Sequence, residues 1–286
     1  VGSDGRIVLT EVDEDELEAL QGISESAGIE AMKQSWLDRG IYYNHDWNDP
    51  EYFHFGDMKF RTVGDEAETG LRYEATEEDR AAIIDEIEAA DRAADWVVAT
   101  LHTHQGVGGK QLTGETPEFV QSFARDCVDA GADVFVGTGP HVLRGIEIYD
   151  DSPIFYSLGN FIVQNETVER LPPESFDRYD LDSVTDVSAV FDARLYDEAG
   201  EPKGDLASEP FWETVVPECT FTAEGGLESV ELHPCTLQQD RPRSQRGIPV
   251  AATGEAAAGI LESVAELSEP FGTELRIDGE SAVIEL

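Results

Sequence analysis

The pattern of apolar and polar residues predicts helices and strands that alternate through the first half of the chain. Apolar residues recur every three or four positions over residues 14–28, 76–94 and 117–131, which predicts three amphipathic helices. The apolar run at residues 96–101 predicts a strand buried on both faces, and residues 133–136 predict a second buried strand. Helices and buried strands that alternate in this way indicate an α/β fold with a layered architecture.

The second half of the chain is predicted to be richer in strands. Short segments there alternate between apolar and polar positions, with glycine or aspartate turns between them. The predicted strands are 145–149, 153–158, 188–197, 212–223 and 227–235, and a final helix is predicted at about 255–267. We treat the chain as a single domain, with an α/β part at about residues 1–165 and a strand-rich part at about 185–286.

The charge of the chain excludes some classes of partner. The 61 aspartates and glutamates outnumber the 19 lysines and arginines, so the formal net charge is −42. Such a surface repels nucleic acid and anionic lipid. The acidic residues are spread along the whole chain, which favours a surface adapted to molar salt over an acidic tail that binds a basic partner. We therefore expect a halophilic protein whose charge does not identify its partner.

Apolar runs and cysteines narrow the cellular context. No run of eighteen apolar residues is present, so no transmembrane segment is expected, and the chain as given is predicted to be soluble and cytoplasmic. The three cysteines have neither the number of a disulfide framework nor the spacing of a zinc site. Cys127 is expected to be a small core residue, and a bond between Cys219 and Cys235 is not expected.

Three histidines follow the two predicted buried strands. His102 and His104 follow the first strand and share one face of an extended chain, and His141 lies in a glycine-proline turn after the second. Ligands of parallel α/β sheets bind beyond the carboxyl ends of the strands, and imidazole is the commonest ligand for transition metals. The three histidines therefore predict a metal site. On spacing alone, ordinary polar histidines in loops are an equal alternative.

Other polar residues near these loops have two readings each. Arg144 could hold a carboxylate or phosphate as a bidentate fork, or form a surface ion pair. Asn160 could orient a ligand or cap its own turn. Ser157 lacks the G-x-S-x-G context of a serine hydrolase. His45 and His54, in the aromatic segment before residue 75, are expected to be exposed or to pack, and His233 is expected to be structural.

Three runs of residues together resemble the CapA family of capsule and poly-gamma-glutamate synthesis proteins. They read AGAD at 130–133, GTGPHV at 137–142 and PIFYSLGNF at 153–161, and the later segments 242–247 and 267–273 resemble the C-terminal end of one branch of the family. The resemblance covers about residues 10–276. It implies a layered α/β/β/α sandwich of the calcineurin-like metallophosphatase type.

The resemblance also implies a function. It implies a divalent metal (Mn, Fe or Zn, as one or two ions) and hydrolysis of a phosphoester or an anionic polymer. The implied metal ligands are His102, His104 and His141, the implied catalytic residues are His104, His141 and Asn160, and the implied substrate-binding residues are Arg144 and Ser157. Members of this family often act outside the cell behind an N-terminal anchor.

The chain departs from the family pattern at several places. Thr138 stands where the family has a further histidine, and Gln105 stands where an acid often follows the His-x-His. The family's upstream Gly-Asp, Asn-Leu-Glu and Asn-Asn-His motifs have no counterpart, so the fold is expected to be incomplete at its N-terminus. These departures keep an alternative open: a non-catalytic component of capsule or polyglutamate assembly, or an inactive fragment, with a degenerate site that holds no metal.

Overall fold

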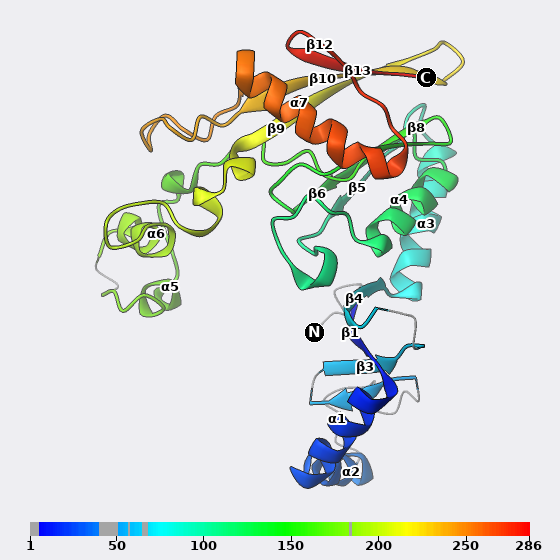
Figure 1. Cartoon of the computed structure of the whole chain (residues 1–286), viewed down its shortest axis with the longest axis vertical. Coiled ribbons are helices and arrows are strands. Elements are labelled where there is room, and N and C mark those ends of the chain that lie inside the picture. Colours follow the sequence, from blue (N-terminus) through cyan, green and yellow to red (C-terminus); the bar gives the residue numbers. More distant parts are fainter. Residues whose placement is uncertain (1–5, 40–50, 57, 65–67, 183–184) are drawn as a thin grey trace. The chain divides into compact units, whose positions relative to one another are not determined.

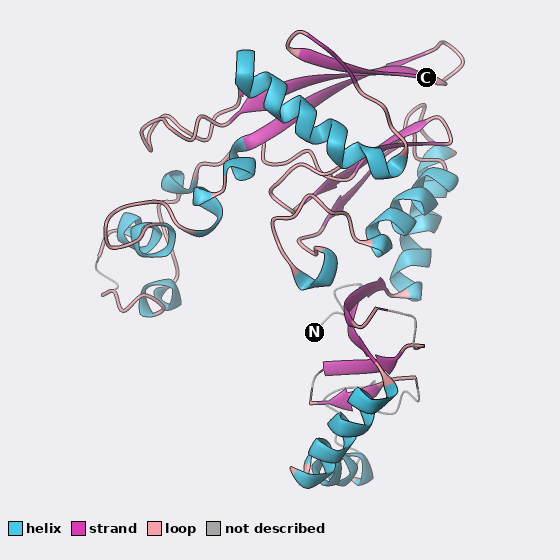
Figure 2. Cartoon of the chain, viewed as in Figure 1, coloured by secondary structure: helices cyan, strands magenta, loops and turns pink. Residues whose placement is uncertain are grey.

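The computed structural model describes residues 6–39, 51–56, 58–64, 68–182 and 185–286. These residues form two compact units. One comprises Val1–Ile83 together with Val107–Lys110, and the other comprises Ile84–Gly106 together with Gln111–Leu286. The helices and strands of both are labelled in Figure 1 and coloured by type in Figure 2. The candidate site residues all belong to the second unit.

The first unit is built on a four-stranded mixed sheet in the order β2-β3-β1-β4. Its strands are β1 (Arg6–Val12), β2 (Phe53–Phe55), β3 (Met58–Thr62) and β4 (Gly70–Ala75), and its helices are α1 (Glu14–Ser26) and α2 (Ile29–Asp38). The helix α1 begins at a capping box, in which Asp13 and Glu16 each accept the other's backbone N–H. The sequence predicted α1 to within two residues but did not predict α2.

The second unit contains the sheet that positions the histidines. This sheet has the order β5-β6-β8-β7, in which β5, β6 and β8 run parallel and β7 is antiparallel. Its strands are β5 (Val98–His102), β6 (Val134–Thr138), β7 (Ile146–Tyr149) and β8 (Ser152–Phe155), and its helices are α3 (Glu77–Asp91), which begins in the first unit, and α4 (Glu118–Asp129). The predicted helices and strands of this region are therefore confirmed.

Alternation along β6 divides the core of the second unit into two parts. Phe135 is buried with residues of α3 and α4, whereas Val134 and Val136 pack against a second cluster on the other face. That second cluster joins the sheet to α7 (Gly254–Ser268) and to the C-terminal strands. The structure is thus a mixed α/β fold, as the sequence predicted.

The C-terminal strands form a five-stranded antiparallel sheet. They are β9 (Glu213–Phe221), β10 (Leu227–Thr236), β11 (Val250–Ala251), β12 (Arg276–Asp278) and β13 (Ser281–Glu285). Figure 1 shows α7 lying along this sheet, where it contacts β10 and β13. The β9–β10 hairpin and α7 were predicted, but β12 and β13 were not. Cys219 pairs opposite Val230, five positions from Cys235, and all three cysteines are free.

Two sequence predictions about this unit are wrong. Residues 188–197 form no strand, because the structure has the helix α6 (Val187–Leu195) there, after the short helix α5 (Pro173–Asp177). Val190 and Phe191 are both buried, which fits a helical face, and short apolar segments do not distinguish the two periods. The strand β5 is not buried on both faces: it is the edge strand, and Val98 is 58% exposed.

Among the described residues, no helix is both long enough and apolar enough to cross a membrane.

Candidate functional site

Adjacent parallel strands bring the three predicted histidines together. His102 is the last residue of β5 and lies in register with Thr138, the last residue of β6. Because parallel strands end at the same edge of a sheet, the loops that follow them meet there. The ring centroids of His102 and His104 lie 5.0 Å apart, and those of His104 and His141 also lie 5.0 Å apart. We call residues 102–106 and 111–113, which belong to the second unit, the first histidine loop, and residues 138–144 the second.

Glycines allow the two loops to touch through their backbones. A Cβ at Gly139 would lie 2.7–2.8 Å from backbone atoms of Thr103, and Gly139 has a φ of +109°. The amide of Thr103 donates to the carbonyl of Thr138 at 2.8 Å. His141 itself has a φ of +62°, which an L-residue seldom adopts. The glycine-proline turn thus presses the second histidine loop directly onto the first.

Thr138 contacts the Nδ1 atom of His102. The Thr138 hydroxyl oxygen lies 3.4 Å from the carbonyl oxygen of Leu101 and 3.0 Å from Nδ1 of His102; when the hydroxyl donates to the carbonyl, its oxygen accepts the Nδ1–H of His102. In that arrangement the Nε2 of His102 carries a lone pair, and it lies 3.1 Å from the Nε2 of His104. Thr138, where the resemblance implied a further histidine, therefore contacts the site through His102.

Asn160 fixes the tautomer of His141. Its Nδ2 donates to the carbonyls of His141 at 3.2 Å and of Phe211 at 2.9 Å, so its Oδ1 accepts the Nδ1–H of His141 at 2.8 Å. The Nε2 of His141 is left with a lone pair. Asn160 thus orients the imidazole of His141 and binds the backbone of the His141 turn, and its contact with a substrate stays a prediction.

Phe211 forms one wall of the site, and no pattern in the sequence pointed to it. Its ring centroid lies 5.8 Å from that of His141. The start of β9 reaches the segment Ser157–Asn160 through a bridge between Gly159 and Thr214, and the Thr214 hydroxyl donates to the carbonyl of Leu158 at 2.6 Å. Two residues after Phe211, burial and the nearby Glu209 raise the pKa of the Glu213 carboxyl.

The imidazoles are suitable metal ligands by their chemistry, but their positions match a metal site only in part. Two nitrogens bound to one ion at about 2.0–2.1 Å in tetrahedral geometry lie roughly 3.3 Å apart, close to the 3.1 Å between the Nε2 atoms of His102 and His104. In the part of the chain that the structure describes, however, no three His, Cys, Asp or Glu side chains are grouped to hold an ion. The site is a pair of facing imidazoles with a third ring beside it.

The predicted substrate-binding residues are both buried. Arg144 is 1% exposed, which contradicts its reading as a surface ion pair. Its Nη2 and Nε donate to the carbonyls of Gln105 and Thr113, and burial lowers its pKa to about 10. Ser157 is also 1% exposed, and its hydroxyl accepts the N–H of Gly159 at 3.3 Å. Contact of either side chain with a substrate stays a prediction.

The remaining histidines lie outside this cluster. His233 on β10 is half-exposed, and its Nε2 lies 3.4 Å from a carboxylate oxygen of Glu218 on the neighbouring strand. His54 on β2 is buried in the first unit, as a packing histidine would be. His45 lies outside the described residues.

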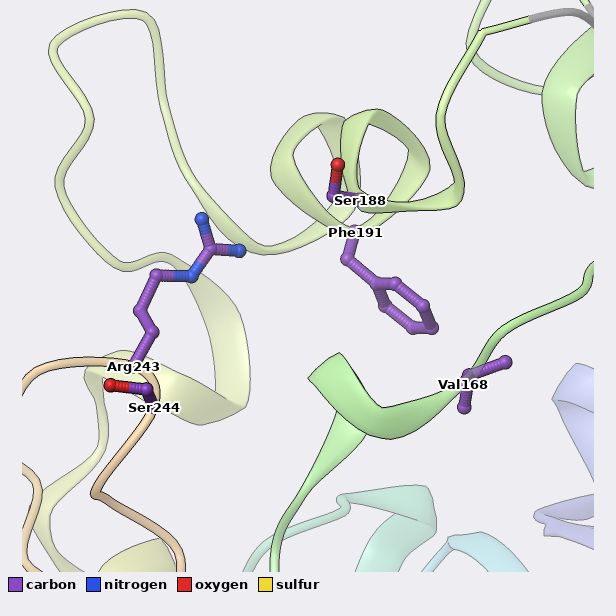
Figure 3. Close-up of a pocket in the computed structure, with 5 residues that line it drawn as sticks. All are labelled: Val168, Ser188, Phe191, Arg243 and Ser244. Atoms are coloured by element: carbon purple, nitrogen blue, oxygen red, sulfur yellow. The ribbon is translucent and has the colours of Figure 1, made fainter.

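A separate cavity of about 310 Å³ contains none of the predicted site residues. It is lined by Val168, Ser188, Phe191, Arg243 and Ser244, and Figure 3 shows Phe191 projecting from its helix toward Val168. Asp192 lies 2.7 Å from the Arg243 guanidinium, which also stacks over the ring of Tyr196 at 4.6 Å. The candidate site at the histidines and this cavity are therefore different places.

Comparison with known proteins identifies a family match over the region that contains the candidate site. Residues 25–165, which hold all three histidines and Asn160, match the family described as bacterial capsule synthesis protein PGA_cap. The uncharacterized protein y4sH of Sinorhizobium fredii is 35% identical over 243 residues, which are 84% of this chain and 51% of that protein. This chain therefore spans about half the length of that relative.

Two relatives with named roles match over shorter stretches. The PGA biosynthesis protein CapA of Bacillus subtilis is 42% identical over 76 residues, which are 27% of this chain and 19% of that protein. The capsule biosynthesis protein CapA of Bacillus anthracis is 41% identical over 69 residues, 24% of this chain and 16% of its own length. The chain belongs to the CapA family of bacterial capsule synthesis proteins.

Proposed function

We propose that this chain is a metal-dependent hydrolase that acts on a phosphoester or an anionic polymer in capsule or poly-gamma-glutamate biosynthesis. One observation carries the proposal: Thr138 and Asn160 engage the Nδ1 atoms of His102 and His141, so each ring presents an Nε2 lone pair beside His104. Ligating histidines in proteins are held in this way, by a hydrogen bond on the nitrogen that does not bind the metal. We also propose that the α/β fold is a layered sandwich of the calcineurin-like type.

The proposed ligands are His102 and His104, with His141 as a third ligand or as a proton carrier. A Mn, Fe or Zn ion held there, alone or as a pair, would polarise the scissile group and lower the pKa of a bound water. Asn160 holds the proton of His141 on Nδ1, so a proton is accepted and returned at Nε2. The ring of Phe211 covers one side of His141 and excludes water there.

A second candidate is a non-catalytic component of capsule or poly-gamma-glutamate assembly. It is favoured by the lack of a three-residue ligand group among the described residues. In this reading the Nε2–H of His104 donates to the Nε2 of His102, and the 3.1 Å separation is that of a hydrogen bond between two neutral rings.

Metal content and hydrolysis distinguish the two candidates. We would purify the chain in molar KCl, measure bound metals by elemental analysis, and assay bis(p-nitrophenyl) phosphate with added Mn²⁺, Fe²⁺ or Zn²⁺. We expect about one or two ions per chain, lost in His102→Ala and His104→Ala, and a fall in hydrolysis of at least about 100-fold. His233→Ala is the matched control and should leave both unchanged, since His233 pairs only with an exposed glutamate in the described structure.

The assembly reading makes the opposite prediction. It is supported if the chain binds none of the three metals above background and if His102→Ala hydrolyses the phosphodiester as fast as the unmodified chain. That pair of results would overturn the hydrolase proposal.

A further inference from the structure

Arg144 contacts all three segments that form the candidate site. It belongs to the second histidine loop, three residues after His141. Its backbone N–H donates to the carbonyl of Ser157 at 3.1 Å, in the segment that ends at Asn160. Its guanidinium reaches the first histidine loop, where Nη2 donates to the carbonyl of Gln105 at 2.8 Å and Nε donates to the carbonyl of Thr113 at 3.2 Å.

The two carbonyls belong to the two parts of the first histidine loop. Gln105 directly follows His104, and Thr113 lies eight residues further along the chain. A guanidinium is planar and rigid, so two of its nitrogens can hold two acceptors at a fixed separation. Arg144 therefore holds the carbonyls of Gln105 and Thr113 at a fixed separation and holds the His104 end of the first histidine loop against the loop of His141.

The charge on Arg144 is costly, and its surroundings do not neutralise it. The side chain is 1% exposed, and no carboxylate within the described residues forms an ion pair with it, although the chain has 61 acidic residues. Its Nη1 is buried without a hydrogen-bond partner in the described structure. Burial of a guanidinium without a counter-charge lowers stability relative to an apolar side chain of similar volume. A purely structural role in packing would be filled better by methionine.

We propose that Arg144 is a positioning residue of the histidine site: its guanidinium fork holds the first histidine loop against the second and so sets the separation of His104 and His141. The role concerns the geometry of the site and does not depend on bound metal. Only its consequence for hydrolysis rests on the proposed function.

Chemical rescue tests the fork directly. The Arg144→Ala variant leaves a guanidinium-shaped cavity, which millimolar guanidinium chloride can fill and methylammonium chloride cannot. Two readouts need neither metal nor substrate: amide hydrogen exchange over the first histidine loop, and ¹⁵N shifts of the His102 and His141 ring nitrogens, which report the tautomers. In Arg144→Ala we expect exchange to rise by at least about tenfold and the ¹⁵N shifts of the His141 ring to change, because the loop of His141 loses its hydrogen bonds to the first histidine loop. Guanidinium should restore both.

Two further variants complete the test. Arg144→Lys keeps the charge, but a single ammonium does not reproduce the fork, so it should resemble Arg144→Ala and not the unmodified chain. Arg125→Ala is the matched control, because Arg125 binds the Glu147 carboxylate in the same unit and contacts none of the histidine loops in the described structure. Guanidinium should have no effect on the histidine signals of Arg125→Ala.

The proposal is overturned if Arg144→Ala folds with native exchange and native ring shifts, or if Arg144→Lys is indistinguishable from the unmodified chain. If Arg144→Ala does not fold by itself, its refolding yield is compared in the presence of guanidinium and of methylammonium. Equal yields of folded protein also overturn the proposal. Because no readout uses metal or substrate, loss of the positioning role and loss of the hydrolase function are separate results.

Discussion

Replacement of Asn160 by alanine should destabilise the chain and release the ring of His141. The asparagine makes three hydrogen bonds, to the Nδ1–H and carbonyl of His141 and to the carbonyl of Phe211. At a net 0.5–1.5 kcal/mol for each bond, Asn160→Ala should lower the free energy of unfolding by about 2–4 kcal/mol. For a chain of this size that corresponds to a fall in Tm of roughly 3–7 °C.

The assay is urea unfolding at constant molar KCl, followed by circular dichroism. Asn160→Asp separates the two roles of the side chain. An aspartate still accepts the Nδ1–H of His141, but it donates to neither carbonyl. We therefore expect Asn160→Asp to lose stability to a similar extent while the ring nitrogens of His141 keep their ¹⁵N shifts, whereas Asn160→Ala changes them. Asn165→Ala, in the short turn Asn165–Thr167, is the control and should stay within about 0.5 kcal/mol of the unmodified chain.

Two results would refute the reasoning. A loss below about 0.5 kcal/mol in Asn160→Ala would show that the three hydrogen bonds make no net contribution. Unchanged His141 ring shifts in Asn160→Ala would show that another group holds the tautomer.

Three further predictions test the fold around the site. Gly139→Ala should lower the free energy of unfolding by about 2–4 kcal/mol, because its Cβ would lie 2.7 Å from the backbone of the first histidine loop. The control Gly225→Ala, which has a φ of +93° but open space around it, should lower it by only about 1 kcal/mol. Equal losses in the two variants would contradict the steric argument. Burial raises the pKa of the Cys127 thiol from 9.0 to about 12. The thiol therefore ionises at lower pH in the unfolded chain, and the free energy of unfolding should fall as pH rises from about 9 to 12. Cys127→Ala should reduce this dependence on pH, and an unchanged dependence would contradict the prediction. Glu147→Gln weakens the bidentate pair with Arg125, and urea unfolding should show a loss of about 1–3 kcal/mol; an unchanged midpoint would show that the pair is not stabilising.

The local pattern of the sequence was enough to predict most elements of the second unit. Helices α3, α4 and α7 follow from helical spacing, and β6 follows from a short apolar run between turn signals. The helix α6 was mistaken for a strand because a segment of nine residues, most of them apolar, is too short to distinguish the helical period from the strand period. The exposure of β5 could not be predicted either, since the order of strands in the sheet makes it an edge.

The sequence also determined where the histidines gather. His102, His104 and His141 follow strands that pair in parallel, so their meeting at one edge follows from strand order and from the glycines that let the loops touch. The sequence did not reveal what orients the rings. From the sequence, Thr138 was interpreted as the loss of a metal ligand. In the structure its hydroxyl hydrogen-bonds His102. This bond could not be predicted, because it depends on the register between the ends of two strands.

Only the tertiary structure decided the roles of residues that act over long distances in the chain. From the sequence, Arg144 was interpreted as a fork for a ligand or as a surface ion pair. In the structure it is a buried fork that binds two carbonyls of the first histidine loop, 31 and 39 residues away in the chain. Phe211 reaches His141 from 70 residues further along the chain. Periodicity in the sequence reports which face of an element is apolar. Which donors and acceptors meet inside the fold depends on how the elements pack, because each buried polar group must find its partner in three dimensions.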